Sequence, residues 1–322
     1  DLGCPEGDAW SVVSMICVSE TWSRYLSAKH ADITTMAFAD NWTLWLGNAQ
    51  LRPEPVFETD DFVRWMGLEI SWSKTWVWST DSEGSRRLLH MLQDYLQEED
   101  LRAMTTATDL GCQMTYHGHS KLGILQDRFE KAGSRLLALK HYTWVLPLKC
   151  HLVHTSVLPL ALYGVELHAV GQRHLDTLRT QIADSLAGET LKSMSSAIMV
   201  NCACKKSLDP HFQALCLAVK AARKFLYRAD EATKADFLKI LSMPSKHIGK
   251  SLGPVTALHE YLQRVGLTCS ADGWIAATAF RKCHLLDDSF ADLHRYLTWA
   301  CLARPVVVTA NAKNQIVQSA TN

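Results

Sequence analysis

The sequence contains no apolar run long enough to cross a membrane, and nothing in it reads as a secretory leader. Its longest apolar stretch, residues 152–165, is shorter than the roughly 20 residues that a membrane helix needs. A histidine and a proline also interrupt that stretch. No basic start followed by an apolar segment opens the chain. We therefore expect an intracellular protein, nuclear or cytoplasmic, that is not secreted and has no membrane partner.

Closely spaced cysteine pairs are also lacking. The ten cysteines are scattered, and no two of them have the C-x-x-C spacing. Cys202 and Cys204 stand two positions apart, which is a poor spacing for zinc. We expect reduced thiols that mostly lie in the core, with a zinc site as the less favoured alternative.

The 322 residues show no internal repeat, and 48% of them are hydrophobic and 20% charged. This composition is ordinary for folded proteins and predicts one large domain or two smaller ones. The net charge is zero, but residues 1–110 carry −10 (18 acidic, 8 basic) and residues 111–322 carry +10 (25 basic, 15 acidic). An acidic half beside a basic half fits a metal-binding region next to a phosphate-binding one. Two unrelated solvated surfaces fit the charges equally well.

Hydrophobic spacing and turn signals predict an α+β layer over the first part of the chain. The expected elements are a helix from Asp8 to about Lys29, two strands flanking Asp40-Asn41, a helix over 53–66, a strand over 70–78, a helix capped by Asp81 or Ser82, and one or two strands over 105–116.

The second half has mainly helical periodicity. We expect helices over 122–139, 148–170, 172–187, 209–229, 231–242 and 254–265. From about Cys269 onward the periodic signal weakens, and residues 306–322 are expected to form a loose tail.

The segment Phe38-Ala39-Asp40-Asn41 has the form of a hairpin tip that carries a carboxylate. Nucleotide polymerisation uses two divalent metals roughly 3.5–4 Å apart, held by carboxylates on rigid strands. A hairpin tip presents such a ligand to an open cleft on a fixed backbone. An Asp-Asn pair in an ordinary turn is the alternative interpretation.

Four motifs in chain order carry a resemblance to a known family. Residues 3–11, Gly-Cys-Pro-Glu-Gly-Asp-Ala-Trp-Ser, resemble reverse transcriptase motif B, G-x-P-Q-G-x-x-x-S. Residues 38–41 resemble motif C, [FY]-x-D-D, and residues 67–75 resemble the motif D segment GL-x-[IL]-N-x-x-K-T. Residues 109–112 resemble the motif E segment. Over roughly residues 1–190, the chain resembles the reverse transcriptase of a non-LTR retrotransposon.

This resemblance implies a partial polymerase palm, an antiparallel sheet with helices, over 1–117. It further implies a thumb-like helical region over 118–190, a helical C-terminal extension over 191–305 and the tail over 306–322. The implied partners are an RNA template, a DNA primer and deoxynucleotides, with Mg²⁺ as cofactor. The implied catalytic residues are Asp40, Asn41 and Lys74, with Asp40 as metal ligand. The implied nucleotide- and template-binding residues are Gly3, Glu6, Gly7 and Ser11, and the implied primer grip is Leu110 and Gly111.

Physical chemistry fits several of these roles. A glycine at position 7 lets the backbone approach a base pair or phosphate closely, and Ser11 lies near a helix N-terminus, where anions bind. Lys74 is a mobile cation suited to a pyrophosphate leaving group; a surface lysine is the alternative. Glu6 replaces the family's usual Gln and exchanges an amide for a group that only accepts hydrogen bonds. Trp42, just after the hairpin tip, is a candidate to border the cleft.

Basic residues recur at helical intervals in the thumb-like region. Lys121, Arg128, Lys131 and Arg135 can share one helix face, and Lys220, Lys224 and Arg228 can share another. Such stripes suit the phosphate backbone of a primer–template duplex. A solvated helix face is the alternative for each.

The sequence also departs from the family pattern. Motif A, which supplies a further metal-binding Asp, lies upstream of motif B in the family, and Asn41 stands where motif C has its second carboxylate. We expect Asp40 alone to bind Mg²⁺ weakly or not at all. Loss of the motif A strand would leave an apolar sheet edge around Met36 to Phe38. The leading hypothesis is a partial polymerase that is inactive as this chain; the alternatives are a non-catalytic nucleic-acid-binding remnant and a helical scaffold without such a role.

Overall fold

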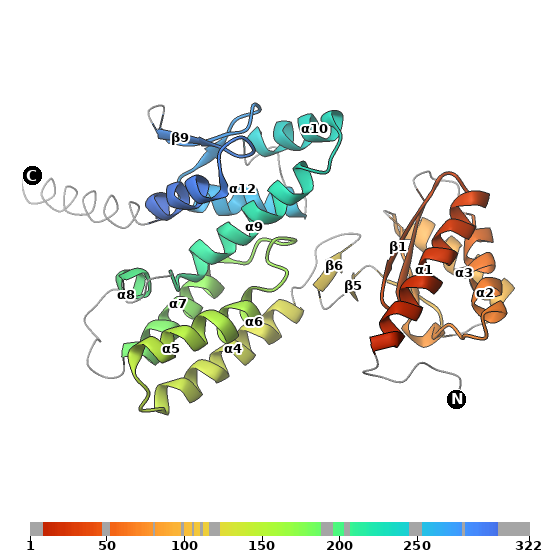
Figure 1. The fold of residues 1–322 in the computed structure, drawn as a ribbon, viewed down its shortest axis with the longest axis horizontal. Coiled ribbons are helices and arrows are strands. Elements are labelled where there is room, and N and C mark those ends of the chain that lie inside the picture. The colour runs from red at the N-terminus through yellow and green to blue at the C-terminus, as the bar shows by residue number, and fades with distance from the viewer. Residues whose placement is uncertain are drawn as a thin grey trace, which may run out of the picture. The chain divides into compact units, whose positions relative to one another are not determined.

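The computed structural model describes residues 9–46, 52–79, 81–97, 100–104, 106–109, 112–115, 123–187, 196–202, 207–244, 253–278 and 281–301. The chain divides into two compact units (Figure 1). The N-terminal unit consists of residues 1–107 and 115–120, and the C-terminal unit consists of residues 108–114 and 121–322.

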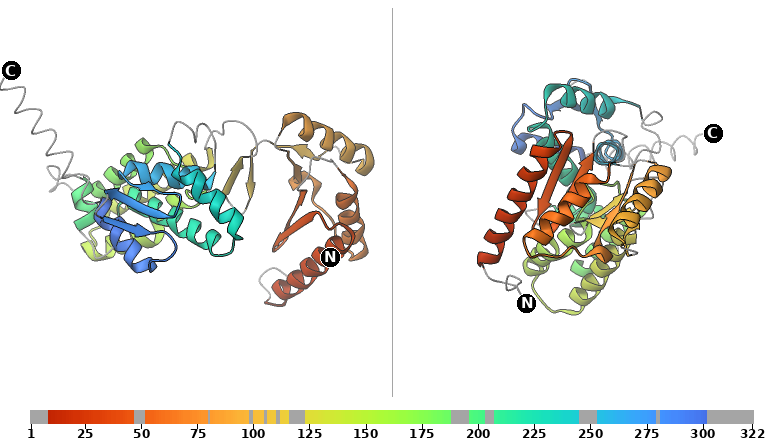
Figure 2. Two further views of the ribbon diagram at one scale, coloured as in Figure 1. Left: turned by 90° about the horizontal axis from the view of Figure 1, so that it is seen from above. Right: turned by 90° about the vertical axis from the view of Figure 1, so that its right-hand side faces the viewer.

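The N-terminal unit begins with a long helix and a hairpin. Helix α1 (Ala9–Lys29) precedes β1 (Ile33–Phe38) and β2 (Asn41–Leu46), which pair antiparallel from Ile33↔Leu46 to Phe38↔Asn41. Helix α2 (Glu54–Trp65) follows, with Pro55 in its first turn. Helix α1 packs against both β1 and α2 (Figure 2). These elements confirm the helices and the hairpin that the sequence predicts.

The next segment departs from the prediction of a strand over 70–78. Residues Trp72–Lys74 form the 3₁₀ turn η1, and only Trp76–Val77 form a strand, β3. Thr75 Oγ1 donates to the Ser71 carbonyl at 2.9 Å, which closes the turn. Local side-chain bonding of this kind competes with strand formation, even where aromatic residues favour a strand.

Helix α3 (Ser82–Leu96) completes the N-terminal unit with β4 (Arg102–Ala103), which pairs parallel to β3. Asp81 caps α3 by accepting a hydrogen bond from the Gly84 amide at 2.6 Å. Between the two capping candidates in the sequence, the structure selects Asp81. Two small apolar clusters hold this unit together, one around Trp22, Leu26, Phe62 and Val63 and the other around Val77, Leu92 and Leu101.

Strands β5 (Thr106–Asp109) and β6 (Cys112–Thr115) pair with each other, as predicted for residues 105–116. A run of helices follows in the C-terminal unit. They are α4 (Gly123–His141), α5 (Leu146–Leu152), the π-helical turn η2 (Val153–Val157), α6 (Leu158–Leu162), α7 (Gln172–Ala187), α8 (Ser196–Cys202), α9 (Pro210–Leu226), α10 (Glu231–Ser242) and α12 (Pro254–Arg264). The predicted helices are confirmed, except that the helix expected over 148–170 ends at Leu162. Helix α8 was not predicted.

Prolines mark where several of these helices begin. Pro147, Pro159, Pro210 and Pro254 each occupy the first turn of their helix. Proline suits this position because its missing amide hydrogen would have no helical acceptor there. The helix starts are therefore encoded locally.

A small sheet follows α12, where the sequence predicts only a helical extension with a weakening signal. Strands β7 (Thr268–Cys269), β8 (Trp274–Thr278) and β9 (Arg281–His284) form an antiparallel meander. The prediction of a mainly helical extension over 191–305 did not include these strands. Gly273, with φ of 87°, makes the turn into β8. A last helix covers residues 290–301, and the tail over 306–322 lies outside the described residues.

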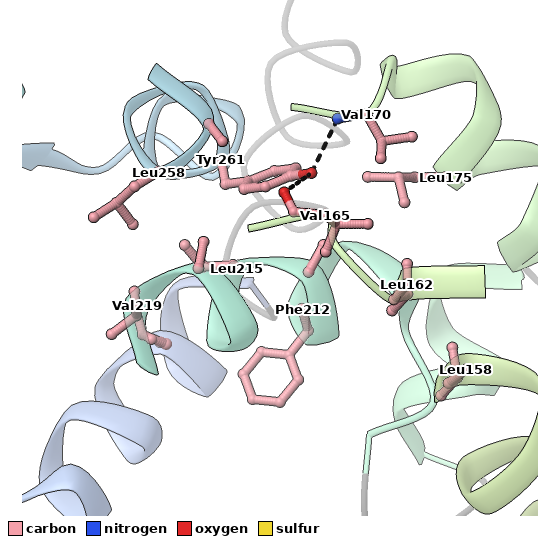
Figure 3. Packing of buried hydrophobic residues seen from close by; sticks show 14 of the residues in the cluster. Leu158, Leu162, Val165, Val170, Leu175, Phe212, Leu215, Val219, Leu258 and Tyr261 are labelled. Atoms are coloured by element: carbon pink, nitrogen blue, oxygen red, sulfur yellow. Dashed lines mark hydrogen bonds between the residues drawn. The ribbon is translucent and has the colours of Figure 1, made fainter. Parts of the chain in front are cut away.

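The C-terminal unit has one continuous hydrophobic core. It runs from Leu125 in α4 to Ala300 in the last helix, so the stretches predicted as thumb and as extension share it. Tyr261 is held in this core by two hydrogen bonds. Its hydroxyl accepts from the Val170 amide at 3.0 Å and donates to the Val165 carbonyl at 3.2 Å (Figure 3). Burial raises the pKa of Tyr261 to about 12.

The architecture is thus mixed, with many helices and several small sheets, as the predicted α+β class requires. No helix within the described ranges combines the length and the apolar character needed to span a bilayer.

Candidate functional site

The tip of the β1–β2 hairpin consists of Ala39 and Asp40. Phe38 and Asn41 form the last cross-strand pair, so Asn41 belongs to β2. The turn is therefore displaced by one residue from the expected Asp40-Asn41. Ala39 has φ of 53°, a left-handed conformation that glycine usually supplies in two-residue hairpin turns. For alanine this costs about 1–2 kcal/mol, and backbone strain of this kind is concentrated at functional sites.

Two tryptophans anchor the hairpin to helix α1. The ring of Trp42 stacks on that of Trp22, with centroids 4.5 Å apart. Trp42 Nε1 donates to Ser19 Oγ at 3.0 Å, and Trp22 Nε1 donates to Thr59 Oγ1 at 3.1 Å. Trp42 thus packs inward as an anchor, which corrects the expectation that it borders a cleft. The anchor lies directly beside the tip and holds the backbone that carries Asp40.

The outer edge of the hairpin is apolar and exposed. Among the residues that the structure describes, β1 pairs only with β2. Met36 and Phe38 on β1 are 58% and 64% exposed. An open, apolar strand edge of this kind favours pairing with another strand.

Asp40 and Asn41 both face solvent. Together they offer one carboxylate and one amide oxygen, whereas a pair of divalent ions needs several carboxylates. Nowhere in the described ranges do three His, Cys, Asp or Glu side chains gather in a metal-holding arrangement. The tip by itself therefore does not fit a pair of magnesium ions.

Lys74 lies at the end of the η1 turn, with its side chain exposed. Its backbone amide donates to the Ser71 carbonyl at 3.0 Å, so the turn fixes the backbone from which the exposed side chain extends. Lys74 and Asp40 belong to the same unit, and within its described part no hydrogen bond or ion pair joins them. The structure thus presents both as solvent-facing groups without bringing them into contact.

Most residues of the predicted template site and primer grip lie outside the described residues. These are Gly3, Glu6, Gly7, Leu110 and Gly111. Ser11 is described and lies half-buried in the first turn of α1.

The first basic stripe is partly engaged within its own unit. Arg128 donates to the Tyr163 carbonyl at 2.6 Å and lies over the Tyr163 ring at 4.6 Å. Arg135 donates to Ser156 Oγ at 2.9 Å. Lys131 is exposed on the same helix, and Lys121 lies outside the described residues. The two arginines therefore help to hold α4 in place, and Lys131 is, among the described members, the one whose charge is most open to a phosphate.

The second stripe is exposed throughout. Lys220 and Lys224 lie on the solvent face of α9, and Arg228 follows in the turn after it. The opposite face of α9 is buried in the core. This amphipathic division places three cations on one accessible surface.

Sequence spacing did not reveal a polar network among α7, α8 and α9. Arg179 binds Asp209 with contacts of 2.9 Å to both carboxylate oxygens, and Asn201 Nδ2 donates to Asp209 at 2.9 Å. Asp209 also caps α9 by accepting from the His211 amide. The Asp209-Pro210 pair signals a helix start, but nothing in the sequence identifies its distant partner.

His211 belongs to the same network. Its Nε2 lies 2.9 Å from Asp176 Oδ1. Burial and the nearby Arg179 charge lower the pKa of His211, and they outweigh the opposing effects of Asp209 and Asp176. The ring is therefore neutral near pH 7 and donates its Nε2 hydrogen to Asp176.

A small pocket of about 220 Å³ lies between α10, α12 and β7. His259 and Cys269 line it. His259 Nε2 lies 3.1 Å from the Met243 carbonyl, and burial lowers the pKa of this histidine. Burial raises the pKa of the Cys269 thiol to about 12, so it is not a nucleophile at neutral pH.

Comparison with known proteins gave no match: no family model, no curated protein and no solved structure corresponds to this chain.

Proposed function

We propose that this chain is part of an RNA-directed DNA polymerase of retrotransposon origin and that it does not polymerise on its own. The observation that carries the proposal is the solvent-facing Asp40 on a strained two-residue tip, braced by the Trp22–Trp42 stack. Such a tip holds a carboxylate in a fixed position, which two-metal nucleotidyl transfer needs. The order of the four motif-like segments along the chain supports the same interpretation.

The inactivity follows from ligand chemistry. Asp40 is the single carboxylate at the tip, and the neighbouring Asn41 brings no charge. The open edge at Met36 and Phe38 suits a further strand that would bring the second carboxylate. The polymerase proposal therefore requires such a strand, ending in an Asp, to pair with β1.

The coding sequence immediately upstream tests this requirement. An in-frame segment that encodes a strand ending in Asp should, when joined to this chain, allow magnesium-dependent extension of a DNA primer on an RNA template. Asp40→Asn should abolish that extension, whereas the matched change Asp61→Asn, at an exposed position of α2, should not. Stop codons upstream, or extension that survives Asp40→Asn, would count against an active polymerase.

A non-catalytic nucleic-acid-binding remnant is the second candidate. The exposed stripe of Lys220, Lys224 and Arg228 favours it, since three clustered cations attract a phosphate backbone. This candidate predicts salt-dependent binding of a primer–template duplex with no extension under any magnesium concentration. Lys220→Ala should weaken binding about equally for all sequences and reduce the salt slope by about 1.

A further inference from the structure

The loop between α4 and α5 exposes two aromatic rings that stack on each other. Tyr142 and Trp144 have ring centroids 4.5 Å apart and planes only 11° apart. Tyr142 is 51% exposed and Trp144 is 42% exposed. This loop connects α4 to α5 at the bottom of Figure 1. Two large rings that stack on each other and yet remain about half exposed offer a flat, partly preformed contact surface.

The surroundings of this pair are apolar and contain no acid from their own segment. Residues 131–165 include no Asp or Glu. Lys140 and His141 precede the pair directly and are both exposed. Lys149 does not contribute to the surface, because it is buried with its Nζ 3.5 Å from the Ser185 carbonyl. The exposed apolar neighbours are Leu137, Val145, Leu146 and Leu148.

We propose that the Tyr142–Trp144 pair is a stacking platform for an unpaired base of a single-stranded nucleic acid, whose phosphate lies against Lys140. This inference rests on the proposed function and adds a second type of contact to it. Single-strand binding sites combine aromatic side chains, on which bases stack, with cations that follow the backbone. The parallel rings supply the first element, and the acid-free basic segment supplies the second.

A lipid surface is the competing partner, because exposed Trp, Tyr and Leu side chains beside lysines also occur at membrane interfaces. The parallel stacking favours the nucleic acid. Insertion among lipids uses the apolar area of each ring separately, whereas a base extends an existing stack. Substitution of Val145 distinguishes the two partners: it should weaken insertion into lipid, but it should not affect stacking of a base.

The experiment compares two substrates bound by the full chain in fluorescence anisotropy. One is a blunt RNA–DNA duplex, and the other is the same duplex with an unpaired extension of RNA or of DNA. We expect the extension to tighten binding by the wild type. Trp144→Ala should weaken binding of the extended duplex by about five- to a hundredfold, and Tyr142→Ala should have a similar effect. Trp144→Phe should retain most of the gain, since it keeps a ring.

Controls separate the platform from general effects. Val145→Ser and Phe290→Ala should leave the gain from the extension unchanged; Phe290 is an exposed aromatic residue elsewhere in the same unit. Binding of the blunt duplex should be the same in all variants. A parallel sedimentation assay uses vesicles of phosphatidylcholine and phosphatidylserine. Circular dichroism melting verifies that each variant is folded.

The outcomes are distinct. Loss of the extension-dependent gain in both alanine variants supports the platform, and the RNA and DNA extensions show which strand it accepts. An unchanged gain in Trp144→Ala, while the blunt duplex is still bound, overturns the platform and leaves the proposed function intact. The platform is also overturned, in favour of a membrane, if vesicle binding depends on Trp144 and Val145 while the unpaired extension does not tighten nucleic-acid binding. If the wild type binds no nucleic acid, both the platform and the proposed function fail.

Discussion

The indole ring of Trp42, one residue after the final hairpin pair, stacks on that of Trp22 at the middle of α1, with planes 22° apart. Trp22 is fully buried, and its ring nitrogen donates to Thr59 in α2. A single side chain of α1 thus joins the hairpin to α2. The position of Asp40 therefore depends on the packing of the Trp22–Trp42 stack.

Replacing Trp22 should destabilise the N-terminal unit severely. Trp22→Ala removes the largest buried side chain of its cluster and leaves Thr59 without its donor, so we expect a loss of about 3–5 kcal/mol. Urea unfolding followed by tryptophan fluorescence reports mainly on this unit, since eight of the eleven tryptophans precede residue 80. Trp10→Ala is the matched control: Trp10 is 73% exposed, and its loss should change stability by no more than about 0.5 kcal/mol. Equal effects of the two substitutions would refute the anchoring role.

Glycine at position 39 should stabilise the hairpin. Ala39→Gly relieves the left-handed strain, and we expect a gain of about 1 kcal/mol after the added unfolded-state entropy is subtracted. Ala37→Gly, in the extended part of β1, should instead lose about 0.5–1 kcal/mol. The same urea titration measures both variants. A loss of stability in Ala39→Gly would mean that the tip does not have the left-handed turn.

The partly buried pair of Arg179 and Asp209 should be sensitive to the loss of either partner. Asp209→Ala removes the hydrogen bonds that Arg179 makes to it and uncaps α9, so we expect a cost of about 2–4 kcal/mol for the C-terminal unit. The double change Arg179→Ala/Asp209→Ala should cost less than the sum of the single changes. The exposed pair Arg295–Asp292 is the control: Arg295→Ala should cost at most about 1 kcal/mol. If the stability losses of the two single variants simply add up in the double variant, Arg179 and Asp209 do not interact.

Acid should destabilise the C-terminal unit through its neutral histidines. The pKa of His211 is lowered in the fold, so between that value and the ordinary 6.5 the unfolded chain binds more protons. The contribution of His211 to the free energy of unfolding is therefore fully present above pH 6.5. It is lost as the pH falls toward the folded-state pKa. His259, whose pKa is also lowered, contributes in the same direction.

Thermal or urea unfolding at several pH values, followed by far-UV circular dichroism, measures this dependence. The double variant His211→Gln/His259→Gln should show a flatter pH profile than the wild type. Replacement of the exposed His90 in α3 should leave the profile unchanged. A double variant with the wild-type slope would show that other groups cause the acid sensitivity.

The open edge of β1 should promote self-association. Met36→Lys places a charge on the exposed strand, which opposes edge-to-edge pairing, and it should raise the concentration at which light scattering first detects aggregates. Leu217→Lys adds the same charge on an exposed face of α9 and should have a smaller effect. Equal effects of both would attribute the change to net charge alone.

Local chemistry in the sequence was enough to predict many elements. Helix α3 follows from Asp81 as cap, the helices that begin with prolines follow from Pro210 and Pro254, and the hairpin follows from its turn flanked by apolar runs. In each case neighbouring residues decide the conformation. The strand predicted over 70–78 failed because hydrogen bonding within Ser71–Thr75 outweighed aromatic strand preference. The β7–β9 meander escaped prediction because its strands are short and their pattern is weak.

The sequence alone determined that a carboxylate follows a short apolar strand and that basic residues recur along later helices, because both are matters of composition and spacing. Tertiary structure alone decided which of these groups face solvent. It turned Trp42 inward onto Trp22, committed Arg128 and Arg135 to carbonyl and hydroxyl groups of their own unit, and left Tyr142 and Trp144 stacked in water. The physical reason is that exposure and hydrogen-bond partners arise between residues far apart in the chain, and no local pattern encodes them.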